Sequence, residues 1–322
     1  MLSMVKILAV RLGTVLLGWT LVLPTVAMAA DPVAVVTEIR AEGGQVEVKR
    51  VGESAWGAAQ PLQALRAGDQ IRAGGAARAA VVFTGGRGAQ SVSSANSPFT
   101  VQPPAAAASG DKLRGLVGGV TDFLSGKQKD LAYLPLSVRN VRPPRVVQLA
   151  PRDTKILPGA VAFEWSGSDT LRYRVRVLSA QGLLWEQADL PRRPVAYPAS
   201  APALQPGVRY LWQLETTGQP VQQTEFEILA PGDAARVRES LGILVPASLP
   251  GYPDSSVAIM RAGYLLRDGL YAEARRELLA AQAKDPDEPT LHLLLGQVYE
   301  TTGLTDLAQR EYVDARDLSA RR

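Results

Sequence analysis

The sequence contains no cysteine and only one histidine, His292. Without cysteine the chain forms no disulfide, has no thiol nucleophile and offers no cysteine for a lipid anchor. With one histidine and no cysteine, most metal-site spacings are excluded, and a Ser–His–Asp triad would have to be built on His292. The sequence therefore predicts a protein that is not an enzyme and that has no metal and no cofactor.

The charge balance gives little support to nucleic acid as a partner. The chain has 35 Lys and Arg against 31 Asp and Glu, and no dense basic stripe with interleaved aromatic residues is present. The glycines Gly85, Gly86 and Gly88 lack the lysine and the following helix that a phosphate-binding loop needs. We therefore expect neither a nucleic-acid partner nor a nucleotide site.

Residues 1–30 have the pattern of a secretory signal peptide. Two basic residues are followed by the apolar run from Leu12 to Leu23, and Ala27 and Ala29 supply the small side chains that a signal peptidase requires. An uncleaved N-terminal anchor is the alternative. The segment predicts an exported protein, periplasmic or envelope-associated, and the composition favours a bacterial source.

Residues 31–102 predict a small β domain, because short apolar strands alternate with glycine turns about every ten residues. Its pattern resembles the FecR-type domain of bacterial envelope proteins. The matching residues are Val46, Val48, Trp56, Leu65, Gly68, Asp69, Ile71, Arg72, Gly74, Ala79, Val81 and Phe83. Founding members of that family relay an iron-uptake signal and need a membrane helix before this domain. The predicted signal peptide stands there instead, so the resemblance implies only the fold and the envelope setting.

Residues 103–147 are expected to be linker and one short helix. Asp111 is placed to cap a helix that runs to Leu124, with Leu113, Val117 and Val120 along one face. We expect this helix to pack across the β domain. A helix lying on a membrane surface is the alternative.

Residues 148–230 predict a β-sandwich of immunoglobulin type, because about seven strand-like segments with alternating apolar residues follow one another. The run Leu204-x-Pro206-Gly207-x-x-Tyr210-x-Trp212 resembles a fibronectin type III domain. The sandwich aromatics are expected in the core, with a sugar-binding platform as the alternative. They are Trp165, Tyr173, Trp185, Tyr210 and Trp212. Three arginines are expected on a solvated strand face, with an anionic polymer as the alternative ligand. They are Arg172, Arg174 and Arg176.

Residues 231–254 are expected to form a helix capped by Asp233, then a proline-rich linker, and residues 255–322 to form two helical hairpins. Six positions repeat at a spacing of thirty-four. Ala262, Leu265, Gly269, Ala274, Leu278 and Ala281 recur as Gly296, Tyr299, Gly303, Ala308, Tyr312 and Ala315. This pattern resembles the tetratricopeptide repeat family, which implies a groove that holds a protein or peptide. The open end of two repeats needs a cover, from the chain or from a second copy, so a homo-oligomer is one expectation.

The resemblance places eight candidate partner-binding residues on the groove face of the repeats. They are Ser256, Ile259, Gly263 and Arg267 in the first repeat and Thr290, Leu293, Gln297 and Thr301 in the second. The fold class is thus β followed by α, and the favoured function is a non-enzymatic exported adaptor of the bacterial cell envelope. Two alternatives remain. One is a protein that binds cell-wall glycan or polysaccharide through its β modules, and the other is a FecR-type signalling component.

Overall fold

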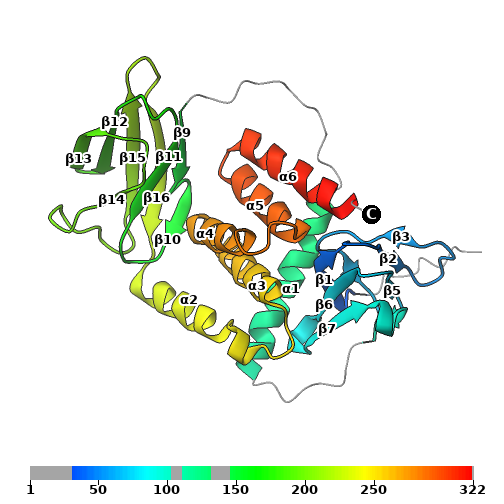
Figure 1. Ribbon diagram of the computed structural model, residues 1–322. Coiled ribbons are helices and arrows are strands. Elements are labelled where there is room, and N and C mark those ends of the chain that lie inside the picture. The colour runs from blue at the N-terminus through cyan, green and yellow to red at the C-terminus, as the bar shows by residue number, and fades with distance from the viewer. Residues whose placement is uncertain (1–30, 103–110, 132–145, 321–322) are drawn as a thin grey trace, which may run out of the picture. The chain divides into compact units, whose positions relative to one another are not determined.

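The computed structural model describes residues 31–102, 111–131 and 146–320. Antiparallel sheets make up most of the N-terminal part and helices most of the C-terminal part, as the sequence predicts (Figure 1). The predicted signal peptide, residues 1–30, and the predicted linker at 103–110 lie outside the described residues, as does the segment 132–145. Among the helices of the described ranges, none combines the length and the apolar character that a membrane crossing requires.

The first β domain consists of two four-stranded sheets, ordered β4-β1-β6-β7 and β3-β2-β5-β8. Its strands are β1 (Ala34–Arg40), β2 (Val46–Lys49), β3 (Gly57–Ala58), β4 (Ala64–Leu65), β5 (Gln70–Ala73), β6 (Arg78–Phe83), β7 (Ala89–Ser93) and β8 (Phe99–Thr100). Strand β1 is buried on both faces. Val36 and Ile39 lie in the core between the sheets, whereas Val35 lies in a second core shared with the helices. The polar residues Thr37 and Glu38 of β1 are buried as well, so this part of the strand has no solvent face.

The turn at Gly68 and Asp69 belongs to the sequence pattern that predicts the first β domain. Gly68 has a φ of +88°, a conformation that glycine adopts without steric cost. The Asp69 carboxylate is almost fully buried and accepts hydrogen bonds from the backbone N–H of Val51 at 3.0 Å and of Arg66 at 2.9 Å. The guanidinium of Arg50 lies 2.9 Å from the same carboxylate. The aspartate therefore joins two loops and has a structural role.

Helix α1 (Asp111–Leu131) extends beyond the predicted end at Leu124. Its apolar face is fully buried through Val117, Val120 and Leu124, and the helix contacts β1, β6 and the first repeat helix. Gly118 lets α1 approach the turn at Gly85, because a Cβ at Gly118 would lie only 3.2 Å from the Cα of Gly85. Protein covers the apolar face of α1. This argues against the alternative of a helix that lies on a membrane surface, because such a helix needs that face exposed.

Strands β9–β16 form the second β region, with a five-stranded sheet ordered β10-β16-β15-β12-β13 and a three-stranded sheet ordered β14-β11-β9. The strands are β9 (Val147–Ala150), β10 (Thr154–Ile156), β11 (Ala162–Ser166), β12 (Tyr173–Ser179), β13 (Gly182–Leu190), β14 (Val195–Ala196), β15 (Arg209–Thr216) and β16 (Gln222–Ile228). The two sheets enclose a core of their own, which includes Phe163, Trp212 and Phe226. This region therefore has the means to fold around its own apolar residues.

The C-terminal part contains two helical hairpins preceded by one further helix. The elements are α2 (Pro231–Ile243), η3 (Pro246–Ser248), α3 (Asp254–Arg267), α4 (Tyr271–Gln282), α5 (Pro289–Thr301) and α6 (Thr305–Ala320). Gly269 and Gly303 make the two hairpin turns with φ of +80° and +75°. The prediction that Asp233 caps α2 is wrong, because the helix begins at Pro231 and Asp233 lies in its first turn. The fixed φ of proline suits the first helical position, which explains the earlier start.

Candidate functional site

The predicted groove face of the repeats is largely covered by the chain itself. Ser256, Ile259 and Thr290 have no exposed surface, and Gly263 is also buried. The Ser256 hydroxyl lies 2.9 Å from the hydroxyl of Thr37 on β1. The first β domain therefore occupies the part of the face where the two repeat helices α3 and α5 begin.

Helix α1 covers the next part of the same face. A Cβ at Gly263 would lie 2.9 Å from the side chain of Leu124 and 3.1 Å from that of Val120, so glycine is required for this contact. Figure 1 shows α1 lying beside α3, in agreement with their contacts. An amphipathic helix in a groove of helices is a common mode of peptide recognition. Here the helix in that place belongs to the same chain.

The other groove positions divide into covered and open ones. Leu293 and Gln297 are each 7% exposed, and the Gln297 side-chain amide has no hydrogen-bond partner among the described residues. Arg267 and Thr301 are exposed. A partner from outside the chain would therefore reach two of the eight predicted residues directly, and it would reach Ser256, Ile259, Gly263 and Thr290 only if β1 and α1 moved.

A buried carboxylate cluster, which sequence reasoning missed, fastens β1 to the loop between α4 and α5. The Glu288 carboxylate has no exposed surface and accepts hydrogen bonds from the backbone N–H of Ile39 at 3.1 Å and of Thr290 at 3.0 Å. Burial, and secondly the charge of Glu38, raise the pKa of Glu288 to about 8, although its hydrogen bonds oppose the shift. Arg40 is the cation of this cluster and pairs with Glu38 and with Asp285. The cluster is a structural joint, with one carboxyl that holds its proton at neutral pH.

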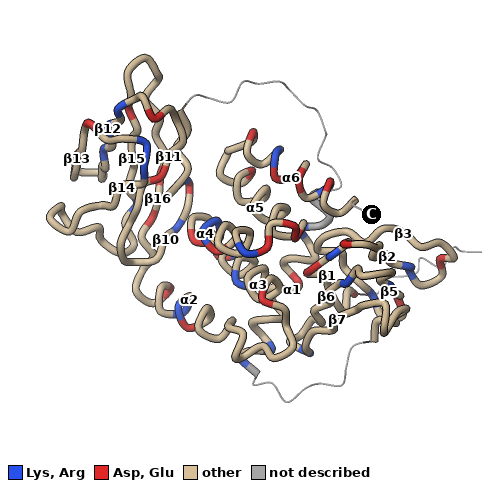
Figure 2. The backbone as a smooth tube through the Cα atoms, in the orientation of Figure 1, with Lys and Arg blue, Asp and Glu red and all other residues tan. Residues whose placement is uncertain are grey.

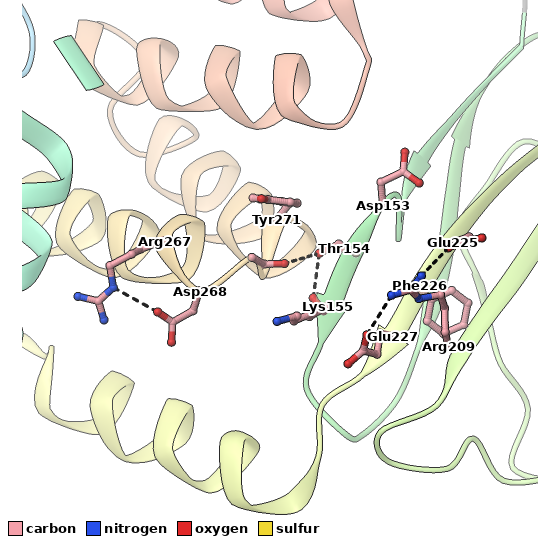
Figure 3. A pocket seen from close by; sticks show the side chains of 11 residues that line it. Asp153, Thr154, Lys155, Arg209, Glu225, Phe226, Glu227, Arg267, Asp268 and Tyr271 are labelled. Carbon is pink, nitrogen blue, oxygen red and sulfur yellow. Dashed lines mark hydrogen bonds and ion pairs between the residues drawn. The ribbon is translucent and has the colours of Figure 1, made fainter. Parts of the chain in front are cut away.

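An open cleft of about 450 Å³ lies between the second β region and the turn from α3 to α4. Figure 3 shows Lys155 extending from β10 toward the end of α3, where Arg267 and Asp268 form an ion pair of 3.2 Å. On the other side Arg209 pairs with Glu225 at 3.5 Å and with Glu227. The exposed ammonium group of Lys155 has no ion-pair partner among the described residues. The cleft therefore offers polar recognition of a peptide segment, with one unpaired cation.

The single histidine is held by two hydrogen bonds. The Nε2 atom of His292 lies 2.9 Å from the Pro286 carbonyl oxygen and its Nδ1 atom 2.8 Å from the carboxylate of Glu311. Burial lowers the pKa of His292, but the bonds with Glu311 and Pro286 outweigh it and raise the pKa overall. Asp314 stands close enough for the three side chains to hold a metal ion, with ligand atoms all within 4.8 Å. Both ring nitrogens therefore already have partners within the chain, the Glu311 carboxylate and the Pro286 carbonyl.

The aromatic residues of the second β region lie mainly in its core, as expected. Trp165, Tyr173, Tyr210 and Trp212 are each at most 5% exposed, and only Trp185 is half-buried. In the first β domain, Trp56 is half-buried, with the Arg72 guanidinium 4.3 Å and the Lys49 ammonium 5.2 Å from its ring centroid. Four of the five rings named in the sugar-platform alternative are therefore buried in the core, and Trp185 alone among them is partly accessible.

The arginines of β12 are neutralised by acidic neighbours. Arg176 lies 2.5 Å from Glu186 and 3.1 Å from Glu215, and Arg174 contacts the same two carboxylates. Arg172 lies 3.6 Å from Asp189. Figure 2 shows basic and acidic positions interspersed along the described chain. This face is the solvated ion-pair surface that the sequence favours, and the charge that an anionic polymer would need is already compensated.

No family model matches the sequence, and no curated protein matches it. The resemblances to the FecR, fibronectin type III and tetratricopeptide families therefore stay predictions from sequence patterns. The function has to be argued from the geometry of the chain.

Proposed function

We propose that this protein is a non-enzymatic adaptor of the bacterial cell envelope, in which tetratricopeptide-like hairpins hold two β modules and a partner protein binds at their seams. The observation that carries the proposal is that the hairpins contact both β modules. Their α3 and α5 helices contact β1, while α4 contacts β10 of the second β region. The hairpins therefore connect the two β modules, and the clefts beside the hairpins are the surfaces that a partner can reach.

The cleft of Figure 3 is the proposed partner site. It is lined by both the second β region and the first hairpin, and it contains Arg267, one of the two exposed residues of the predicted groove. Its charged and polar lining, with Lys155 unpaired, suits a hydrogen-bonding peptide segment.

The test is a crosslinked affinity purification from the envelope of the producing bacterium, read by mass spectrometry. The double variant Lys155→Ala/Arg267→Ala removes two of the three cations that line the cleft and leaves Arg209, which pairs with Glu225 and Glu227. Its matched control is Arg193→Ala/Arg316→Ala, which removes two exposed cations elsewhere. We expect the wild type and the control to recover the same specific envelope proteins, and the cleft variant to lose at least one of them.

Two outcomes would overturn the proposal. If cell-wall material is recovered and no protein is enriched, the glycan-binding alternative is favoured. If the cleft variant recovers the same proteins as the wild type, the cleft is not the partner site. N-terminal sequencing of the mature protein from a periplasmic extract tests the export proposal separately, with cleavage near Ala29 or Ala30 as the expected result.

A further inference from the structure

A second pocket, of about 530 Å³, lies away from the Figure 3 cleft, where the first hairpin meets the ends of β1 and β6. Its lining comes from five separate parts of the chain. They are the ends of the two strands, the short turn η3, helix α3 and the end of α4 with the residues that follow it. We call it the basic pocket, because four cationic side chains line it. They are Arg40, Arg78, Arg261 and Lys284.

Two of the four cations are already neutralised. Arg261 makes a two-pronged pair with Glu277, at 2.7 and 3.1 Å, and also donates to the Leu241 carbonyl at 2.8 Å. Arg40 belongs to the buried carboxylate cluster and pairs there with Asp285. These residues form the fixed walls of the pocket, and their charges are not available to a ligand.

The other two cations, Arg78 and Lys284, are exposed, and neither has an ion-pair partner among the described residues. Arg78 lies directly opposite Arg40 in the β1–β6 register. Like charges at directly opposed positions of an antiparallel pair are destabilising. The acidic neighbours of Arg40 offset its charge, whereas nothing in the described chain offsets that of Arg78. An anion in the pocket would supply the missing counter-charge.

The lining also includes apolar side chains, among them Val257, Ala258 and Ala281, which we call the floor. Asp254, at the start of α3, is the one lining acid without an ion-pair partner among the described residues, since Glu277 and Asp285 are paired. The available charges are thus two positive and one negative, around a surface that suits a methyl or methylene group.

We propose that the basic pocket binds an acidic segment of a partner protein, with its carboxylates on Arg78 and Lys284 and a small apolar side chain on the floor between them. The proposal rests on the proposed function in so far as the ligand is a protein segment. The pocket is lined by five chain segments and has a volume of about 530 Å³, enough for side chains of an extended peptide. Its volume lies within the range of specific ligand sites.

The experiment uses the purified mature chain and a fluorescent peptide of alternating alanine and glutamate, with binding followed by anisotropy at low and high salt. Peptides in which glutamine or lysine replaces glutamate serve as probes of charge. We expect the glutamate peptide alone to bind the wild type, and more weakly at high salt. Because exposed ion pairs are individually weak, Arg78→Ala/Lys284→Ala should weaken binding by about tenfold.

The matched control Arg87→Ala/Arg193→Ala removes two exposed cations outside the pocket and should bind as the wild type does. Asp254→Asn should strengthen binding, because it removes the unpaired acid. The charge-reversed variant Arg78→Glu/Lys284→Glu should bind the lysine peptide instead, a gain that a misfolded protein would not show.

The proposal is overturned if the glutamate and glutamine peptides bind equally, or if the control pair loses as much affinity as the pocket pair. It is equally overturned if only vesicles of anionic lipid bind and the binding depends on the same two cations. Recovery of envelope proteins in the cleft experiment does not depend on this pocket. Failure of the acidic peptide would therefore leave the adaptor proposal standing, and failure of the cleft variants would leave this one standing.

Discussion

The two β regions are attached to the helical hairpins in different ways. The first β domain shares an apolar core with them, because Val35, Leu62 and Val82 belong to the same buried cluster as α1 and the repeat helices. The second β region has a core of its own. It meets the hairpins through hydrogen bonds, through the ion pair of Glu164 with Arg275 and through partly buried apolar side chains such as Leu157. One of the hydrogen bonds is the Glu273 carboxylate accepting from the Leu157 N–H at 2.9 Å, and another is the Lys155 N–H donating to the Gly269 carbonyl at 3.0 Å.

The difference concerns cooperativity. When either side of a shared core opens, the apolar burial of both sides is lost, so the two sides unfold together. A small number of hydrogen bonds contributes only a limited free energy to the coupling between two regions. We therefore expect the first β domain, α1 and the hairpins to unfold as one unit and the second β region to unfold as another. Three of the tryptophans, Trp165, Trp185 and Trp212, lie in the second β region, so fluorescence reports chiefly on it and circular dichroism on the helices.

The largest effect is expected for Phe226→Ala. Phe226 is 1% exposed and lies between Tyr210 and Phe163, with ring centroids 5.6 and 6.0 Å away. Its removal should lower the free energy of unfolding of the second β region by about 3–5 kcal/mol. In denaturant titrations the fluorescence transition should shift while the helical circular dichroism transition stays in place. Val221→Ala, at an exposed position of the same region, is the control. An equal shift of both transitions would show a single cooperative unit.

The complementary change is Leu124→Ala in α1. Leu124 has no exposed surface and contacts Gly263 of α3. The cavity should cost about 2–5 kcal/mol, and the loss should appear in the helical transition with the fluorescence transition unchanged. Leu183→Ala, at a residue 57% exposed, is the matched control. If Leu124→Ala destabilises no more than this control, α1 does not belong to the shared core.

Glu288 tests the joint between the first β domain and the hairpins through its pH dependence. Burial raises its pKa from 4.5 to about 8, so between these pH values the folded chain keeps a proton that the unfolded chain loses. The stability that Glu288 contributes is thus fully present below pH 4.5 and is lost as pH rises toward 8, by about 1.4 kcal/mol per pH unit.

In Glu288→Gln this component of the pH dependence should be absent, as measured by the helical transition across the same pH range. Glu53→Gln, at an exposed position, should keep the wild-type slope. The same slope in wild type and Glu288→Gln would mean that Glu288 ionises normally in the folded chain.

The smallest effect is expected for Glu273→Ala, which removes one hydrogen bond between the second β region and the hairpins. The Leu157 N–H loses its partner, at a cost of about 1–2 kcal/mol. The expected result is a wider separation of the two unfolding transitions and faster proteolysis near Leu157. Arg316→Ala, on the exposed face of α6, should change neither. If Glu273→Ala leaves both quantities as in the wild type, this bond does not couple the two regions.

Local patterns in the sequence predict the elements well where the cause is local. The glycines Gly269 and Gly303 take the positive φ of the hairpin turns, and alternation places Trp212 and Tyr210 inside the second β region. The pattern predicts that Asp233 caps α2, whereas the helix begins at Pro231. Both residue types are favoured near a helix N-terminus, so the sequence pattern does not distinguish the two starts.

The candidate site was less predictable. A helical face with Ser256, Gly263 and Thr290 has the same sequence pattern whether it faces solvent or another part of the chain. One local signal is the apolar character of the successive residues Ala34, Val35 and Val36, which places apolar side chains on both faces of β1. Another is Gly263, which allows a close approach. Neither signal names the segment that packs there, since α1 is more than one hundred residues away in the chain.

By itself the sequence determined the order of β and helical parts, the hairpin turns and the cores of individual strands, because these depend on side-chain periodicity and on the backbone freedom of glycine. The tertiary structure alone decided which surfaces remain open. It placed β1 and α1 over the predicted groove, and it brought Arg40 and Arg78 beside Lys284. These outcomes depend on contacts between residues far apart in the chain, which no local pattern encodes.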